Sequence, residues 1–306
     1  MVKVFVDGSA GTTGLRIKER LSGRDDVELL ILPEELRKDL SARKEALNSA
    51  DVVFLCLPDV ASIEAVSMIE NKSVAVIDTS TAFRTDGGWV YGFPEISNNR
   101  ELIRTSKRIA NPGCHASGFI ALIQPLVENK LIDGTEKLTC FSLTGYTGGG
   151  KKMIEEYVSP CRSELLSAPR QYALGQQHKH LKEMAHVTGL ENKPCFCPIV
   201  APFDCGMEVT VPLFKSQLKG SLDDVIEIYK NKYTDGVVKF VNDDEGGFLS
   251  ACSRKGKDDM TLSVYGNEER ILLVSRFDNL GKGASGSAIQ NMNVLLGINE
   301  TKGLNI

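Results

Sequence analysis

The first hundred residues alternate short apolar runs with segments of helical periodicity, and this alternation restricts the fold more than any other feature. The apolar runs cover residues 2–6, 27–32, 52–57 and 74–78. The run at 52–57 is apolar at every position, which is typical of a strand covered on both faces. Strands separated by helices at this spacing predict a parallel sheet with right-handed crossover connections. We therefore expect a doubly wound α/β domain, in which residues 36–50 form a polar, exposed helix.

The second half of the chain has a different pattern, in which strand-like runs follow one another with fewer helices between them. This pattern predicts a mixed or antiparallel sheet in a separate α+β domain, and 306 residues suffice for two cores. We expect residues 1–113 to form the first domain, completed by a C-terminal helix at 284–306, and residues 114–283 to form the second. The predicted strands of the second domain are 137–143, 197–200, 207–214, 237–241, 261–264 and 271–277.

The composition excludes several classes of protein. With 36 basic and 40 acidic side chains the net charge is −4, and the chain has no block of lysines and arginines. Both features argue against a nucleic acid or an anionic membrane as the main partner. No apolar run is long enough to span a bilayer, and the first residues enter a strand-like run directly, without a signal peptide. The eight cysteines follow no disulfide framework, so we expect free thiols in a reducing cytoplasm.

A glycine-rich turn separates the first predicted strand from the first predicted helix. Its spacing, G-x-x-G-x-x-G at residues 8–14, is a variant of the commoner dinucleotide fingerprint G-x-G-x-x-G. Glycines let the backbone approach a phosphate closely, and a helix N-terminus presents unpaired N–H groups to an anion. A tight turn of small residues has the same composition, but the position between strand and helix favours a phosphate site. The candidate cofactor-binding residues are Gly8, Ser9, Gly11, Thr12, Thr13 and Gly14.

The residues after the second predicted strand leave the choice between NAD and NADP open. Glu34 could accept hydrogen bonds from ribose hydroxyls, as in NAD-binding proteins. Arg37 and Lys38 could instead bind the 2′-phosphate that distinguishes NADP. In the last predicted helix, Asn291 is a further candidate for hydrogen bonds to a cofactor.

One of the cysteines occupies the position of a nucleophile. Pro112 and Gly113 force a turn and place Cys114 at the start of an apolar helix at 119–127. A helix N-terminus stabilises a thiolate and so favours a nucleophilic role. A small buried cysteine is the alternative, and we assign that role to other members of the set: Cys56, Cys140 and Cys252.

Histidines are the candidates for the proton transfers that a thiolate nucleophile needs. His115 follows Cys114 directly, but successive helical residues point about 100° apart, which makes it a poor partner. His178 and His180 remain, with Glu183 one helical turn after His180, where a carboxylate can orient an imidazole. A solvated helix face explains this pattern equally well.

Three other patterns carry weaker signals. Cys195, Cys197 and Cys205 invite comparison with zinc ligands, but C-x-C has no matching second pair, so we expect no metal site. Glycine-rich loops at 144–151 and 281–286 each precede a predicted helix, and each could hold an anionic group or merely connect elements.

Taken together, these motifs resemble the short form of the N-acetyl-γ-glutamyl-phosphate reductases, relatives of the aspartate-semialdehyde dehydrogenases. The Pro-Gly-Cys element at 112–114 is the most specific part. The family usually has Tyr-Ala-Thr after its cysteine, where this chain has His-Ala-Ser at 115–117, and Thr144 and Thr147 stand where serine is expected. The other segments that carry the resemblance are 11–14, 55–59, 78–84, 91–95, 178–180 and 278–284.

The resemblance implies a Rossmann-type cofactor domain, completed by the C-terminal helix, and an α+β domain for catalysis and for contacts within a homodimer or homotetramer. It implies NADP(H) as cofactor and an acyl phosphate as substrate. Cys114 would be the nucleophile, and the His-x-His element would supply the acid or base, with His180 favoured over His178. The candidate substrate-binding residues are Arg84, Ser142, Gly148 and Glu183.

The implied reaction is the NADPH-dependent reduction of N-acetyl-γ-glutamyl phosphate to N-acetylglutamate 5-semialdehyde through a Cys114 thioester, with release of phosphate, in arginine biosynthesis. The chain would then be an aldehyde-forming oxidoreductase. Two alternatives stay open. One is a related acyl-phosphate reductase such as aspartate-semialdehyde dehydrogenase. The other is a dinucleotide-sensing protein without catalytic activity, against which the intact Cys114, His178 and His180 argue.

Overall fold

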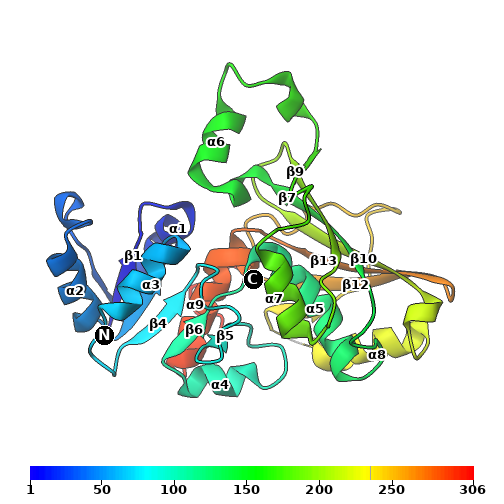
Figure 1. The fold of residues 1–306 in the computed structure, drawn as a ribbon, viewed down its shortest axis with the longest axis horizontal. Coiled ribbons are helices and arrows are strands. Elements are labelled where there is room, and N and C mark those ends of the chain that lie inside the picture. The colour runs from blue at the N-terminus through cyan, green and yellow to red at the C-terminus, as the bar shows by residue number, and fades with distance from the viewer. Residues whose placement is uncertain (235) are drawn as a thin grey trace. The chain divides into compact units, whose positions relative to one another are not determined.

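The computed structural model describes residues 1–234 and 236–306 (Figure 1). Within this part of the chain the fold divides into two compact units. Unit 1 consists of Met1–Pro94, Asn98–Pro112 and Ala284–Leu304. Unit 2 consists of Glu95–Ser97, Gly113–Gly283 and Asn305–Ile306.

Unit 1 contains a six-stranded sheet in the order β2-β1-β3-β4-β6-β5, in which each neighbouring pair is parallel. The predicted doubly wound parallel sheet is therefore confirmed. The strand order reverses direction beside β1, and the carboxyl ends of β1 and β3 flank the crevice where such sheets bind ligands. The strands are β1 (Val2–Asp7), β2 (Val27–Leu30), β3 (Val52–Leu55), β4 (Ala75–Asp78), β5 (Val90–Tyr91) and β6 (Arg108–Ala110).

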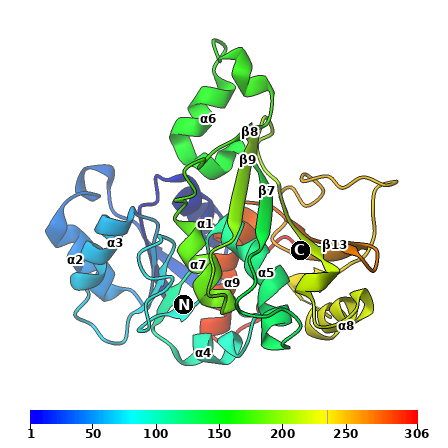
Figure 2. The same ribbon diagram turned by 45° about the vertical axis from the view of Figure 1, so that its right-hand side comes forward.

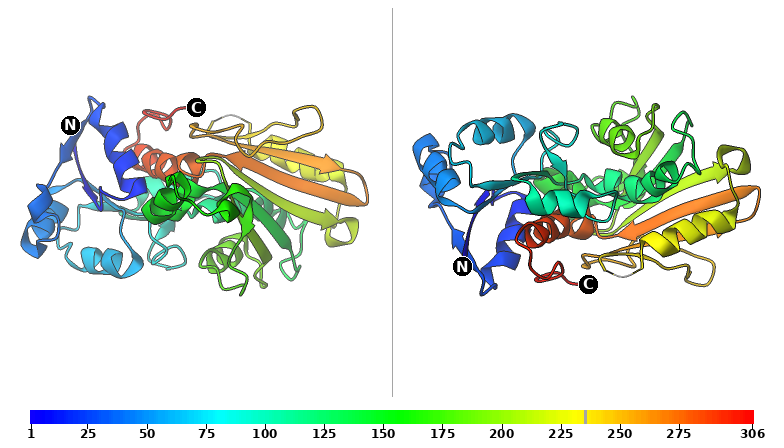
Figure 3. Two further views of the ribbon diagram at one scale, coloured as in Figure 1. Left: turned by 90° about the horizontal axis from the view of Figure 1, so that it is seen from above. Right: turned by 90° about the horizontal axis from the view of Figure 1, so that it is seen from below.

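Helices cover both faces of this sheet. Because successive strand residues point to opposite faces, each strand contributes side chains to two separate cores. Val4 packs in a core with residues of α1 and α9, whereas the next residue, Phe5, packs in a second core with residues of α2 and α3. Figure 3 shows α9, from the end of the chain, beside α1. The helices are α1 (Thr12–Ser22), α2 (Leu40–Ser49), α3 (Asp59–Ser67), α4 (Asn99–Thr105) and α9 (Gly286–Leu295).

The expectation of one exposed helix over residues 36–50 is wrong in two respects. The helix begins only at Leu40, because the Asp39 side chain accepts a hydrogen bond from the Ala42 backbone N–H at 2.8 Å and caps it there. A separate 3₁₀ turn precedes it at Glu34–Leu36. The helix is also not exposed all round, since Arg43 is buried in an ion pair.

Unit 2 contains a seven-stranded sheet in the order β11-β12-β13-β10-β7-β9-β8. The β11–β12 and β7–β9 pairs are parallel and the others antiparallel, so the predicted mixed sheet is confirmed. Figure 2 shows β7, β9 and β8 side by side, with α6 beyond their ends. The strands are β7 (Thr139–Gly145), β8 (Arg170–Gln171), β9 (Cys195–Ala201), β10 (Met207–Phe214), β11 (Val238–Phe240), β12 (Met260–Gly266) and β13 (Arg270–Phe277).

The central helix of unit 2 is α5, which lies directly on the sheet. A Cβ atom added to Gly118 would come within 2.5 Å of Val209 Cγ2 and 2.7 Å of Ser275 Oγ, so a glycine is needed for this close approach. α5 also packs against α7 and α8. The helices of unit 2 are α5 (Cys114–Glu128), α6 (Gly150–Val158), α7 (His180–Thr188) and α8 (Leu222–Lys232).

Short helical turns connect several of these elements. They include a 3₁₀ turn at Tyr146–Gly149, between β7 and α6, and a π-helical turn at Gly281–Ser285, ahead of α9. Among the described residues, no helix is long and apolar enough to cross a membrane.

Candidate functional site

In unit 1 the glycine-rich turn joins β1 to α1 and is closed by a hydrogen bond from the Gly11 N–H to the Gly8 carbonyl oxygen at 3.1 Å. Gly8 has φ +85°, and a Cβ atom there would lie 2.2 Å from the Cys56 carbonyl oxygen. A Cβ atom on Gly14 would lie 2.5 Å from the Gly8 carbonyl oxygen. Both positions therefore exclude a side chain. Within the described chain no side chain caps α1, which leaves its first N–H groups for an anion.

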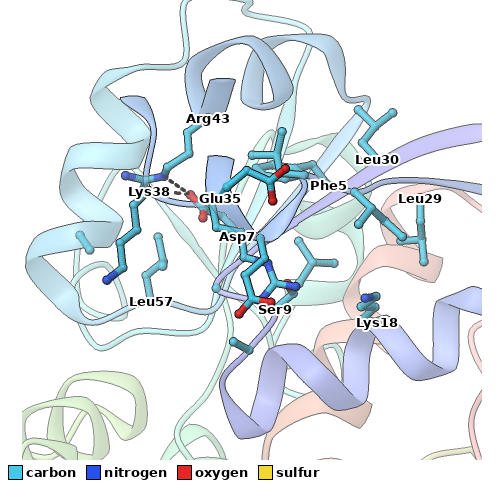
Figure 4. A pocket seen from close by; sticks show the side chains of 18 residues that line it. Phe5, Asp7, Ser9, Lys18, Leu29, Leu30, Glu35, Lys38, Arg43 and Leu57 are labelled. Carbon is cyan, nitrogen blue, oxygen red and sulfur yellow. Dashed lines mark hydrogen bonds and ion pairs between the residues drawn. The ribbon is translucent and has the colours of Figure 1, made fainter. Parts of the chain in front are cut away.

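A pocket of about 630 Å³ opens beside this turn (Figure 4). Of the predicted cofactor-binding residues, Gly8, Ser9, Arg37 and Lys38 line the pocket. The later residues of the turn do not line it, and their role in phosphate binding stays a prediction. The lining also includes Lys18, Glu34 and Glu35, together with apolar residues of β1 and β2: Phe5, Val6, Leu29 and Leu30.

A buried ion pair that no sequence motif predicted forms one wall of this pocket. Arg43 from α2 donates to Asp7 Oδ2 from its Nη2 at 2.9 Å and from its Nε at 3.2 Å, as the dashed lines in Figure 4 show. The two residues are 7% and 5% exposed. Asp7 ends β1, where ligand-binding residues of such sheets gather, but its partner is 36 residues away and no local pattern marks it.

The structure places Asn291 and Arg84 away from the pocket, inside unit 1. Asn291 is fully buried and donates from Nδ2 to the Gly92 carbonyl oxygen at 2.8 Å and to Asn111 Oδ1 at 3.0 Å. Arg84 donates to the carbonyl oxygens of Asn111 and Thr79, both at 2.9 Å. Both side chains therefore hold Asn111, three residues before Cys114, and their predicted ligand contacts stay predictions.

In unit 2 Cys114 is the first residue of α5, and Gly113 is the N-cap. The Gly113 N–H donates to Glu183 Oε1 of α7 at 2.8 Å, and both residues are buried. Cys114 itself is partly exposed, as an attacking thiolate must be. The π-helical turn packs closely on this cysteine, because a Cβ atom on Gly283 would lie 3.0 Å from Cys114 Cβ. Glu183, predicted as a substrate-binding residue, thus fixes the turn that carries the cysteine.

Removing the Glu183 carboxylate is expected to destabilise this turn. In Glu183→Ala the Gly113 N–H would stay buried without its acceptor, which costs about 1–3 kcal/mol of the free energy of unfolding. Glu183→Gln keeps an amide oxygen at the same place and should cost less than about 1 kcal/mol. Denaturant unfolding of both variants measures the difference. Equal losses would show that the hydrogen bond to Gly113 is not what the carboxylate contributes.

Three imidazole rings meet beside this turn. The His115 ring lies 5.7 Å from the His178 ring and 5.6 Å from the His180 ring, between centroids, and the His178 and His180 rings lie 4.7 Å apart. His178 Nδ1 accepts a hydrogen bond from the His180 backbone N–H at 3.2 Å, so its proton is on Nε2. Burial, and then the charge of Lys179, lower the pKa of His178. This shift favours the neutral form of the His178 ring.

His115, predicted to be a poor partner for the cysteine, is buried at the centre of this cluster. Its Nδ1 lies 2.6 Å from Ser142 Oγ and its Nε2 lies 2.7 Å from the Tyr172 hydroxyl. Burial, with a smaller effect from His178, lowers the pKa of His115 to about 3, so its ring is neutral at physiological pH. Ser142, predicted to bind substrate, is 0% exposed and contacts this ring instead.

The second glycine-rich loop, at residues 144–151, lies in unit 2 and is partly exposed. Gly148 is exposed, and a Cβ atom there would lie 3.4 Å from Asn279 Nδ2. Asn279 Nδ2 also donates to Thr147 Oγ1 at 3.0 Å, so the threonine found in place of serine ties this loop to the end of β13. Contact between Gly148 and a substrate stays a prediction.

The remaining cysteines show no sign of a metal centre or of cross-links. None of the eight cysteines forms a disulfide, and no group of three or more His, Cys, Asp or Glu in the described part of the chain could hold a metal ion. Cys140 is buried as expected, whereas Cys56 and Cys252 are partly exposed, so the interpretation of those two as buried is wrong.

Two family descriptions match the chain and cover most of it. Residues 3–106 match the semialdehyde dehydrogenase NAD binding domain, and residues 114–279 match the semialdehyde dehydrogenase dimerisation domain. Curated relatives are similar along nearly their whole length. N-acetyl-gamma-glutamyl-phosphate reductase 2 of Nostoc sp. is 40% identical over 99% of each chain. N-acetyl-gamma-glutamyl-phosphate reductase of Rhizobium leguminosarum is 43% identical over 96% of this chain and 98% of its own.

Solved structures share the fold at much lower identity. Aspartate semialdehyde dehydrogenase II of Vibrio cholerae, in complex with ASA, superposes with a TM-score of 0.74 at 17% identity, over 97% of this chain and 98% of its own. Aspartate semialdehyde dehydrogenase of Candida albicans, with NADP, gives a TM-score of 0.68 at 16% identity, over 97% of this chain and 98% of its own. These likenesses show the fold alone.

Proposed function

The chain belongs to the semialdehyde dehydrogenase family, and from this premise we propose that it reduces N-acetyl-γ-glutamyl phosphate to N-acetylglutamate 5-semialdehyde, with NADPH as reductant, in arginine biosynthesis. The observation that carries this proposal is the setting of Cys114, on the first turn of α5 beside three histidines, in a chain 43% identical to a reductase of that name. A cysteine at a helix N-terminus is the kind of residue that attacks an acyl carbon.

Unit 1 supports the cofactor assignment. A Cβ atom on Gly8 would collide with the Cys56 carbonyl oxygen, so the glycine allows the tight turn that leads into α1, and the pocket beside this turn carries Arg37 and Lys38. Bound NADPH would supply the hydride that reduces the acyl carbon. The pyrophosphate would be held at the N-terminus of α1, and the 2′-phosphate by the two basic side chains.

Unit 2 supports the chemistry at the acyl carbon. The Cys114 sulfur attacks the carbonyl carbon of the acyl phosphate, the bond from that carbon to the phosphate oxygen breaks, and a thioester remains. The backbone N–H of Cys114, at the start of α5, can donate to the oxygen that becomes negative. After reduction the carbon–sulfur bond breaks, the aldehyde leaves, and His180 transfers the proton that this collapse requires.

The reverse reaction tests the proposal most directly. The purified protein is given NADP, phosphate and N-acetylglutamate semialdehyde, with aspartate semialdehyde in a parallel assay. Reduction of NADP that requires phosphate, with the acetylated substrate alone, is the expected result. Activity with aspartate semialdehyde instead would replace the substrate and keep the mechanism. Inactivity with both substrates, in protein that binds NADPH, would favour the sensing function.

Replacing Arg37 and Lys38 together with alanine is expected to weaken NADPH binding at least about tenfold while changing NADH binding little. The reason is that a 2′-phosphate would lose two positively charged partners, and NADH has no such phosphate. Fluorescence titration with both cofactors measures the two dissociation constants. Lys72→Ala, an exposed lysine outside the pocket, is the matched control. An equal effect on both cofactors would contradict this role.

We also propose that the chain forms a homo-oligomer through the open face of the unit 2 sheet. α5 and α8 pack on the sheet, yet Phe141, Leu272 and Phe214 stay 44%, 43% and 65% exposed. Pro212 pairs with Leu272 in the sheet register, which extends this apolar surface across β10 and β13. Exposed apolar surface of this kind is typical of a subunit interface.

Light scattering should give a molar mass of at least twice the 33.4 kDa of one chain, and Leu272→Asp should lower this molar mass. A monomeric wild-type protein would contradict the proposal.

A cytoplasmic location is the natural extension of this proposal. None of the eight cysteines is in a disulfide, and a reactive Cys114 thiol has to stay reduced to act as a nucleophile.

A further inference from the structure

A carboxylate lies in the wall of the unit 1 pocket, at the place where the proposed function puts the phosphates of the cofactor. Asp7 ends β1, and Asp7, Gly8 and Ser9 all line this pocket of about 630 Å³ (Figure 4). Gly8 begins the turn that leads to the start of α1, the proposed pyrophosphate site. Because Asp7 is 5% exposed, water screens its charge poorly. An unpaired carboxylate here would therefore repel the phosphates of a dinucleotide.

Arg43 of α2 supplies the positive charge that balances Asp7. Its Nη2 and Nε donate to Asp7 Oδ2 at 2.9 Å and 3.2 Å, and its Nη1 lies 3.6 Å from Oε2 of the half-exposed Glu64 in α3. All three nitrogens of the guanidinium therefore lie near carboxylate oxygens, and the whole residue is 7% exposed. Arg43 thus differs from Lys38, which lines the same pocket and is exposed.

The start of α2 fixes the direction of this side chain. Asp39 caps the helix, and its carbonyl oxygen accepts the hydrogen bond of the Arg43 N–H at 3.0 Å. One turn later Ala46 and Leu47, on the same face of α2, pack in one core with Phe5 of β1. The face of α2 that carries Arg43 is thereby held against the strand that ends at Asp7, so the ion pair is rigid.

We propose that Arg43 is a positioning residue of the cofactor site, which neutralises and holds the Asp7 carboxylate so that the pyrophosphate of a dinucleotide can bind beside it. Arg43 acts through Asp7 and does not touch the phosphates. The inference rests on the proposed function only in taking the Gly8 pocket as the cofactor site. Since NADPH and NADH share the pyrophosphate, Arg43 should matter equally for both, unlike Arg37 and Lys38, which are assigned to the 2′-phosphate.

Fluorescence titrations of Arg43→Met with NADPH and with NADH test this inference. Methionine keeps much of the hydrocarbon stem and removes the charge, so the Asp7 carboxylate would face the phosphates without a partner. Both dissociation constants should rise at least about tenfold. Lys44→Met is the matched control, because it removes a positive charge from the exposed face of the same helix, outside the pocket. It should bind both cofactors as the wild type does.

A second substitution at Asp7 distinguishes charge balance from a merely structural role. The double variant Asp7→Asn with Arg43→Met loses the ion pair and its hydrogen bonds but leaves no unbalanced charge. It should bind both cofactors within about threefold of the wild type. Asp7→Asn alone should bind both at least as tightly as the wild type, because it removes only the negative charge. A structural role of the pair would instead weaken binding in all three variants.

Three results would overturn the proposal. A double variant as weak as Arg43→Met would show that the guanidinium itself contacts the cofactor. Weaker binding by Asp7→Asn would show that the carboxylate is a ligand. An effect of Arg43→Met on NADPH alone would place Arg43 at the 2′-phosphate.

Arg43→Gln replaces Arg43→Met if the methionine variant does not fold, since glutamine keeps an N–H donor while removing the charge. The same rise in both dissociation constants is expected, and unchanged values would overturn the proposal. Failure of the proposed reaction leaves a different record, namely a wild-type protein that binds both dinucleotides but lacks reductase activity. A wild-type protein that binds neither dinucleotide would overturn this inference together with the cofactor assignment.

Discussion

Cys114→Ser is expected to lower the reductase activity by about three orders of magnitude or more. The serine hydroxyl is almost the same size as the thiol, so the start of α5 should keep its structure. An alcohol, however, does not ionise near neutral pH, and the positive end of a helix cannot make it a comparable nucleophile. Steady-state kinetics in the reverse direction, with acetylated semialdehyde, phosphate and NADP, measure the loss.

The control for this variant is its cofactor affinity. The Gly8 turn and its pocket belong to unit 1, whereas Cys114 belongs to unit 2, so NADPH should bind Cys114→Ser with nearly wild-type affinity. A further control is Cys140→Ser, which changes a buried cysteine of β7 and should leave kcat within a few fold of wild type. Reductase activity retained in full by Cys114→Ser would exclude the thioester mechanism.

His180→Asn is expected to lower kcat by about a hundredfold or more, with a much smaller change in KM. The matched variant is His178→Asn, which should lose far less. His178 Nδ1 already accepts the His180 backbone N–H and so caps the start of α7, a task that asparagine performs well. The His180 ring is 6% exposed and has no equivalent replacement in asparagine for proton transfer.

Kinetics across a range of pH values distinguish the two histidines. Loss of the acid or base should flatten the limb of the kcat profile that it controls, in His180→Asn but not in His178→Asn. A larger loss in His178→Asn, with an altered pH profile, would reverse the assignment. Loss of helical signal in either variant, checked by circular dichroism, would instead report damage to α7.

The parts of the fold that could be predicted are those that neighbouring residues determine. The four apolar runs of the first hundred residues correspond to β1 to β4. A short apolar run predicts a strand buried on both faces without information from the rest of the chain. The start of α5 at Cys114 also followed from a Pro-Gly turn beside an apolar helix. The start of α2 was missed because Asp39, a capping residue, was included in the helix.

Interactions between distant residues could not be predicted in the same way. Glu183 was selected for its spacing from His180, yet its carboxylate holds Gly113, 70 positions earlier. His115 was predicted to be a poor partner for Cys114 because successive helical side chains point in different directions. In the structure its ring contacts Tyr172, 57 positions later. No periodicity or spacing within one segment carries the information that such partners will meet.

The sequence by itself determined the doubly wound sheet, the mixed second sheet, the glycine-rich turn at Gly8 and the cysteine at a helix start. Each of these depends on residues within a few positions of one another, where glycine conformations, caps and apolar alternation act. Only the tertiary structure decided that Arg43 pairs with Asp7, that Glu183 holds the cysteine turn and that His115 joins Ser142 to Tyr172. These partners meet because helices and strands pack in one arrangement, and buried polar groups must then find each other there.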